Sequence, residues 1–322
     1  MKWGFVPRQS PKPKYIVVNA DESEPGTCKD RVLIEFDPHR LIEGCLIAAK
    51  AVGAHRGWVY IRGEYRYLIE HMNRAIAEAY SKGWLGKNIQ GSGFNFDAYT
   101  HSGAGAYECG EETALLDSLE GKRAQPRFKP PFPAVAGLYA SPTVINNVET
   151  IANIPTIVRN GAEWFRQFGT EKSPGFKLYA VSGHVNRPGI YEAPLGITMR
   201  ELLDHAGGVR TGHKVKFWLP GGSSVPMLIE EHLDLPLTYE DIAGAGSMLG
   251  TGTPMVFDET TSVVRAVTGW LRFYKHESCG KCTPCREGTY WMTHMLGKFE
   301  AGRDRKSTRL NSQSPYVISY AV

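Results

Sequence analysis

Three cysteines in one short segment, Cys279, Cys282 and Cys285, constrain this chain more than any other feature. Thiolates spaced three residues apart can converge on one small object, and free cysteines rarely cluster in this way. Structural zinc prefers two separated Cys-x-x-Cys pairs or added histidines, and neither follows downstream. Three close cysteines with a fourth from a distance are typical of an iron–sulfur cluster. The segment predicts such a cluster, and zinc or buried free thiols are the alternatives.

The other three cysteines, Cys28, Cys45 and Cys109, are scattered along the chain. We interpret them as single buried or half-buried thiols. A chain of 322 residues that opens without a secretory signal does not need disulfides for stability. We therefore expect a reducing compartment.

Composition excludes several classes of protein. A hydrophobic content of 42% and a charged content of 22% suit a globular chain of two or three domains. The net charge of +4 is spread without a basic stripe, which argues against nucleic-acid binding. No run of 18 uncharged apolar residues could cross a bilayer.

The segment up to about residue 160 alternates strand-like and helical patterns. Tyr15–Asn19 and Gly57–Ile61 are rich in β-branched and aromatic residues, whereas Leu41–Val52 and Glu70–Lys82 have helical periodicity. This alternation predicts an α/β domain. The expected loops are Asp21–Gly26 and the proline-rich Lys129–Pro133.

Two further textures follow. Between about Gly175 and Leu237, the order strand (Lys177–Gly183), strand (Gly189–Glu192), helix (Thr198–Ala206), strand fits a small β-grasp-like domain. The chain is helical from about Ser262. Apolar residues at helical spacing flank the cysteine segment there and are expected in the core: Val263, Val264, Val267, Leu271, Trp291, Met292, Met295 and Leu296.

Two polar segments are ambiguous when each is taken alone. The small residues of Gly103–Ala114 would let backbone approach a ligand, and a helix is expected at Thr113–Leu119. The G-x-G-x-x-G spacing is absent, however, and an acidic pair stands where it would repel phosphate. The acidic segment Asp21–Glu24 fits a solvated loop or a cation site equally well.

Taken together, these segments resemble NADH-quinone oxidoreductase-F, the NADH-oxidising flavoprotein subunit of respiratory complex I. The resemblance extends from Met1 to about Arg303. The motifs that carry it, in order, are Asn19–Thr27, Arg62–Tyr65, Gly103–Ala114, Lys129–Pro133, Asn146–Thr150 and Glu277–Arg286.

The resemblance implies a fold and a reaction. It implies a non-Rossmann α/β FMN-binding domain (residues 1–160), a ubiquitin-like β-grasp domain (161–242) and an α-helical bundle that binds iron–sulfur (243–303). Hydride would pass from NADH to FMN, and single electrons would pass on to a [4Fe–4S] cluster and to quinone. No side chain is expected to act as acid or base in the hydride step.

The resemblance also implies site residues. Phe5 and Phe132 would stack on adenine, and Glu24 would bind ribose hydroxyls. The FMN contacts would be Lys2, Asn19, Asp21, Tyr107, Gly110, Glu111, Asn146 and Asn147; the NADH contacts Phe5, Glu24, Glu112, Lys129 and Phe132; and the metal ligands Cys279, Cys282 and Cys285.

Both ends of the chain depart from this family. A glycine-rich loop that helps to hold the flavin would lie just before Lys2, and the fourth cluster cysteine would lie beyond the region of resemblance. We interpret 304–322 as a translated sequencing adapter, because the codons of a common adapter encode Asp304–Ser312 and Ile318–Val322. We therefore expect an incomplete flavin cradle and three cluster ligands.

Two alternatives remain open. The chain also resembles the diaphorase subunit of an NAD-reducing hydrogenase or of an NAD-linked formate dehydrogenase. A non-catalytic module with zinc on its cysteines is the second alternative. The expected partners are a thioredoxin-like [2Fe–2S] subunit and other subunits of the complex I peripheral arm. The expected location is the cytoplasmic face of a bacterial inner membrane or the mitochondrial matrix.

Overall fold

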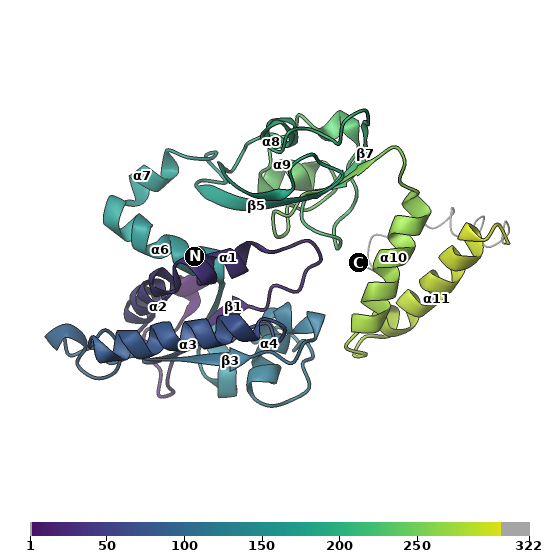
Figure 1. Ribbon diagram of the computed structural model, residues 1–322. Coiled ribbons are helices and arrows are strands. Elements are labelled where there is room, and N and C mark those ends of the chain that lie inside the picture. The colour runs from purple at the N-terminus through teal and green to yellow at the C-terminus, as the bar shows by residue number, and fades with distance from the viewer. Residues whose placement is uncertain (1, 304–322) are drawn as a thin grey trace. The chain divides into compact units, whose positions relative to one another are not determined.

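The computed structural model describes residues 2–303, and these residues form two compact units (Figure 1). The first unit comprises Met1–Ser23 and Cys28–Ala162. The second begins at Glu163 and also includes the short segment Glu24–Thr27. The proposed adapter segment, 304–322, lies outside the described residues.

The first unit contains a four-stranded parallel sheet in the order β3-β2-β1-β4. β1 is buried on both faces, as a strand of a parallel sheet covered by helices must be, which explains its apolar sequence. The α/β prediction for this region is therefore confirmed. The strands are β1 (Tyr15–Ala20), β2 (Arg56–Ile61), β3 (Asp97–Ser102) and β4 (Thr143–Asn147).

Helices cover both faces of this sheet (Figure 1). Ile16 and Val18 pack with α2, α3 and α6 on one face, whereas Tyr15 and Val17 pack with α4 on the other. The helices are α1 (Lys29–Phe36), α2 (Pro38–Val52), α3 (Arg66–Ser81), α4 (Glu112–Leu119), α5 (Pro133–Ala136) and α6 (Val148–Asn160). Short 3-10 helices are η1 (Lys2–Phe5), η2 (Ile89–Gly91), η3 (Tyr107–Gly110) and η4 (Leu138–Ala140).

The second unit contains a mixed four-stranded sheet in the order β6-β5-β8-β7. β5 is antiparallel to β6 and parallel to β8, and β7 is antiparallel to β8. The predicted order strand, strand, helix, strand is observed. The elements are α7 (Ala162–Arg166), β5 (Phe176–Gly183), β6 (Gly189–Pro194), α8 (Met199–His205), β7 (Val215–Leu219), η5 (Glu230–His232), α9 (Tyr239–Gly244) and β8 (Met255–Asp258).

Two helices complete this unit, α10 (Val263–Glu277) and α11 (Thr283–Glu300), and they contact each other. The prediction that their apolar stripes form core was wrong. Of the eight residues named, Leu271 is buried, Trp291 is 61% and Val263 is 36% exposed, and the other five are half-buried. The physical reason is geometric: two helices that pack mainly on one another bury only the narrow side where they meet.

Among the described residues, no helix is both long enough and apolar enough to cross a membrane.

Candidate functional site

The carboxyl ends of the four parallel strands bring the distant motifs of the first unit together. The register pairs Ala20 with Ile61 and Ile61 with Ser102, and it pairs Asn19 with Asn147. The loops that follow these strand ends therefore begin at one edge of the sheet. Open parallel sheets bind ligands at this edge.

Asn19 connects the end of β1 to the η3 turn. Its Nδ2 donates to the Gly110 carbonyl at 2.8 Å, and its Oδ1 accepts from the Asp21 backbone N–H at 3.2 Å. The Asp21 side chain is buried and accepts from the Ser23 hydroxyl. A Cβ atom added at Gly110 would lie 3.3 Å from Asp21 Oδ2. Because Gly110 has no side chain, the surface beside Asp21 stays open at this position.

The loops after β2 and β3 approach each other backbone to backbone. A Cβ atom at Gly63 would lie only 2.5 Å from the Gly103 carbonyl oxygen. Gly105 has a φ of +78°, in the left-handed region that glycine favours. The small residues of the Gly103–Ala114 segment thus form a surface of exposed backbone at the sheet edge.

The first turn of α4 is capped by Glu111. Its Oε2 accepts from the backbone N–H groups of Thr113 (2.8 Å) and Ala114 (2.9 Å). Burial alone would raise the pKa of Glu111, but the hydrogen bonds from Thr113, Ala114 and Lys129 hold it below its ordinary value. Because a carboxylate already occupies these amides, this helix start does not offer them to a phosphate.

Glu112 lies between two lysines. Lys2 Nζ is 3.0 Å from Glu112 Oε2, and Lys129 Nζ is 2.7 Å from Glu112 Oε1 and 3.3 Å from Glu111 Oε1. These four side chains sum to zero charge. Burial would raise the pKa of Glu112, but Lys129 and Lys2 outweigh it and lower that pKa. Ion pairs therefore join residues that are 110 positions apart in sequence.

Two aromatic side chains of the predicted site are exposed. Phe5, at the end of η1, is 63% exposed, and Phe132, directly before α5, is 58% exposed. They follow Lys2 and Lys129 in sequence, and both lysines bind Glu112. Both rings are exposed enough to stack on a planar ligand.

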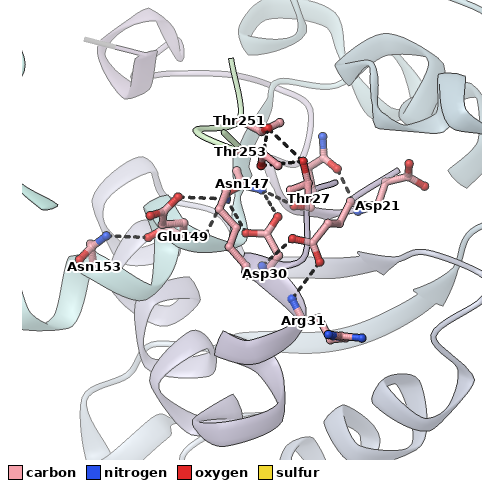
Figure 2. Close-up of polar contacts among 12 residues, drawn as sticks. Asp21, Thr27, Asp30, Arg31, Asn147, Glu149, Asn153, Thr251 and Thr253 are labelled. Carbon is pink, nitrogen blue, oxygen red and sulfur yellow. Dashed lines mark hydrogen bonds and ion pairs between the residues drawn. The ribbon is translucent and has the colours of Figure 1, made fainter. Parts of the chain in front are cut away.

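A buried charged cluster lies beneath the end of β4. Figure 2 shows Asp30, Asn147 and Glu149 side by side, and Lys29 pairs with Asp30 at 2.7 Å and with Glu149 at 3.0 Å. Glu22 caps α1 through the Asp30 N–H (2.6 Å) and the Arg31 N–H (3.0 Å). Sequence reasoning missed Glu22, Lys29, Asp30 and Glu149 as parts of the site. The available signal was a Lys-Asp pair directly after an acidic loop.

Glu24 belongs to the second unit, unlike the other four predicted NADH contacts. Its Oε1 accepts from the Ser224 backbone N–H at 2.8 Å, and a Cβ atom at Gly222 would clash with it. In the same segment the Thr27 hydroxyl lies 3.0 Å from those of Thr251 and Thr253 (Figure 2). This acidic segment is thus a structured loop.

The three clustered cysteines lie at the turn between α10 and α11. Cys279 is half-buried, Cys282 is the N-terminal cap residue of α11, and Cys285 is in its first turn. None of the three is joined in a disulfide. Among the described residues, these three sulfurs do not form a group whose ligand atoms all lie within 4.8 Å of one another.

The other three cysteines lie where single thiols were predicted. Cys45 and Cys109 are buried and Cys28 is half-buried, and all are free. Burial raises the pKa of Cys45 to about 12, so this thiol is an inert part of the core.

A second group of possible metal ligands lies in the second unit: His213, Asp258 and Glu259, with ligand atoms within 4.8 Å. The buried Asp258 carboxylate already contacts the Arg210 guanidinium and lies 3.1 Å from His184 Nδ1. Because a fixed cation already neutralises Asp258, we interpret this group as an ion network that holds β8 in place.

Comparisons with known proteins support one family. Residues 1–156 match the family described as the Nuo51 FMN-binding domain, 178–228 match the SLBB domain, and 265–314 match the NADH-ubiquinone oxidoreductase-F iron-sulfur binding region. The NADH-quinone oxidoreductase-F protein of Mycobacterium tuberculosis is 64% identical over 306 residues, covering 94% of this chain and 69% of the relative. Its counterpart in Streptomyces coelicolor is 62% identical over 307 residues, covering 95% of this chain and 68% of the relative.

This chain belongs to the NADH-quinone oxidoreductase-F family. The resemblance found in the sequence is therefore confirmed. A solved structure is also similar: a chain of an NAD+-reducing [NiFe]-hydrogenase in the air-oxidised state, with 39% identity and a TM-score of 0.83. The match covers 94% of this chain and 50% of the hydrogenase chain. This member of the NADH-quinone oxidoreductase-F family and the hydrogenase chain thus share one fold.

Proposed function

We propose that this chain is the NADH-oxidising flavoprotein subunit of a multi-subunit NADH-quinone oxidoreductase. One observation carries the proposal: the family's separated motifs converge at the carboxyl edge of the parallel sheet in the first unit. The matched FMN-binding and iron–sulfur regions support the same conclusion. When bound, FMN supplies the step from a two-electron hydride donor to single electrons.

The residues at the sheet edge suit a flavin. A Cβ atom added at Gly105 would meet only the Glu64 side chain, at 3.9 Å, and one added at Gly110 only Asp21 Oδ2, at 3.3 Å. Asn146 lies beside them in the proposed pocket, and its Oδ1 accepts from Trp3 Nε1 at 3.0 Å. We propose that the eight FMN residues named from the sequence form this pocket. The amide of Asn147 is fully used by protein partners, so its contribution would be to shape the pocket.

We propose that NADH binds beside the exposed aromatic rings and the ion-paired glutamates. Phe5 and Phe132 would stack on the base of the dinucleotide, and Lys129 would orient Glu112 beside the cofactor's sugar or amide. Glu24 is proposed to accept from ribose hydroxyls. No acid or base is needed on the protein for hydride transfer.

Cys279, Cys282 and Cys285 would supply three thiolates to a [4Fe–4S] cluster. The matched iron-sulfur binding region, residues 265–314, includes all three cysteines and supports a cluster rather than zinc. The domain arrangement proposed is a non-Rossmann FMN domain, a ubiquitin-like β-grasp domain around β5–β8, and a helical iron–sulfur domain.

The chain would work with other subunits. We propose a thioredoxin-like [2Fe–2S] subunit and the rest of a complex I peripheral arm as partners, at the cytoplasmic face of a bacterial inner membrane or in the mitochondrial matrix. Similarity to the hydrogenase chain favours one alternative, a diaphorase subunit that exchanges electrons with NAD in a soluble enzyme.

Replacing Gly110 by Leu tests the flavin pocket. The new side chain would project beside Asp21, and its Cβ meets no backbone atom within 4 Å, so the fold should persist while FMN binding is lost. Gly269→Leu is the matched control, because Gly269 lies in α10 with open space around it. Titration of FMN fluorescence measures both. Unchanged FMN affinity in Gly110→Leu would contradict the proposed pocket.

A further inference from the structure

Lys29 is a buried ammonium with a full set of partners. The residue is 3% exposed, and its Nζ lies 2.7 Å from Asp30 Oδ1, 3.0 Å from Asn147 Oδ1 and 3.0 Å from Glu149 Oε2. These three acceptors match the three hydrogens of an ammonium group. Burial alone would lower the pKa of Lys29, but Asp30 and Glu149 raise it, so the ammonium stays charged.

The partners come from three elements. Asp30 is in α1, Asn147 ends β4, and Glu149 is in the first turn of α6. Lys29 therefore joins two helix starts to one strand end at the carboxyl edge of the sheet.

The side-chain amide of Asn147 is saturated within this network. Its Nδ2 donates to Asp30 Oδ2 at 2.6 Å and to the Asn19 carbonyl at 3.2 Å. Its Oδ1 accepts from Lys29 Nζ and from the Glu149 backbone N–H, both at 3.0 Å. A flipped amide would put its NH₂ group against the ammonium, so Lys29 selects one orientation.

This orientation reaches the proposed flavin pocket through Asn19. Asn19 pairs with Asn147 across β1 and β4, and its own Nδ2 holds the Gly110 carbonyl at 2.8 Å. A change at Lys29 is thus transmitted through Asn147 and Asn19 to the η3 turn.

We propose that Lys29 is a positioning residue for FMN: it fixes the Asn147 amide and thereby sets the ends of β4 and β1 that form the pocket. The inference rests on the proposed flavin site. Lys29 touches no cofactor itself.

Lys29, Asp30 and Glu149 carry a net charge of −1, and replacing Lys29 by Met together with Glu149 by Gln keeps that sum. This double replacement leaves the buried Asp30 carboxylate without its cation, and an unpaired buried charge is destabilising. The FMN affinity of the double variant is therefore compared with that of a variant destabilised away from Asn147.

The decisive experiment compares the unmodified chain, after removal of FMN, with the double variant Lys29→Met/Glu149→Gln. Thermal unfolding reports the fold, flavin fluorescence titration reports FMN affinity, and potentiometry reports the flavin midpoint potential. We expect a lower unfolding temperature, FMN binding at least tenfold weaker and a shifted potential. FMN affinity within twofold of the unmodified chain and an unshifted potential would overturn the inference.

Arg40→Met is the matched control. Arg40 lies in α2 and donates to two groups of α6, the Ala152 carbonyl (2.6 Å) and the Thr156 hydroxyl (2.7 Å). Neither contact involves Asn147. We expect lower stability with FMN affinity kept within twofold. If this variant weakens FMN as much as the double variant does, the effect is general α6 packing and the inference is wrong.

Asp30→Asn keeps the inference testable should the double variant not fold. The replacement preserves the shape of the side chain and removes one buried charge. In the unmodified chain one Asp30 oxygen accepts a hydrogen bond from Lys29 and the other accepts one from Asn147. An asparagine has a single side-chain oxygen, so its NH₂ group would face one of these two donors. FMN binding should weaken severalfold, and unchanged affinity would contradict the inference. If the chain extended by the family's glycine-rich loop binds no FMN, the proposed function fails and the inference fails with it.

Discussion

Glu22 is a buried carboxyl in the loop after β1, and it occupies an unusual backbone conformation with a φ of +32°. Burial, and then the nearby charge of Asp30, raise the pKa of Glu22 to about 7. Its carboxylate accepts hydrogen bonds from the first backbone N–H groups of α1, those of Asp30 and Arg31. This residue therefore titrates near neutral pH beside the proposed flavin pocket.

Replacing Glu22 by Gln should reduce the pH dependence of stability. The folded pKa of about 7 lies above the ordinary value of 4.5, so this group's stabilisation is complete below about pH 4.5 and is lost as pH rises through 7. The unmodified chain should lose roughly 1–3 kcal/mol more than the variant between about pH 5 and pH 8. Urea unfolding at several pH values measures this difference. Parallel curves for the two proteins would refute the shifted pKa.

Single residues also show where sequence reasoning stops. Lys29, Asp30 and Glu149 are charged, and charged residues are mostly exposed, so composition assigns them to the surface. Their burial depends on pairing among elements over a hundred residues apart. The family resemblance identified Asn19 and Asn147 but not the ammonium that orients them.

At the scale of elements, α4 connects the fold to the site through its N-terminal cap. Glu111 accepts from the Thr113 and Ala114 amides and also binds Lys129. Capping and positioning are thus combined in one carboxylate.

Glu111→Ala should lower the free energy of unfolding by about 1 kcal/mol, because two helix-start amides lose their acceptor. It should also weaken FMN and NADH binding, since Lys129 loses a partner. Asp37→Ala is the control: Asp37 caps α2 through the Arg40 N–H at 3.0 Å, away from the sheet edge. Equal stability losses with equal cofactor affinities in both variants would show that Glu111 acts only as a cap.

Elements with strong periodicity were predictable from sequence. β1 and β2 are short β-branched or aromatic runs, and α8 begins at Met199, directly after Thr198, which forms a capping box with Glu201. The stripes of α10 and α11 were assigned to core because period alone cannot say what covers a helix. The polar strand β3, which pairs with β2 on one side only, carried no comparable signal.

At the scale of the whole molecule, the chain contains residues for both ends of the proposed electron route. The first unit holds the proposed flavin residues, and the second holds the cysteine turn. The segment Glu24–Thr27 lies between two stretches of the first unit in sequence but belongs to the second unit. The sequence did not predict this grouping. Its prediction as a loop was correct, but the grouping depends on distant partners such as Thr253, which is 226 residues away from Thr27.

Transfer of electrons from NADH through FMN to an iron–sulfur cluster is the central function proposed for this chain. The most direct test is an anaerobic titration with NADH of the chain extended by the family's glycine-rich loop and fourth cluster cysteine and loaded with FMN and iron, monitored by flavin absorbance and by EPR. We predict that NADH bleaches the flavin band and that a reduced [4Fe–4S] signal develops. A flavin band that stays unbleached by NADH, or bleaching without any cluster signal in an iron-containing sample, would contradict the account.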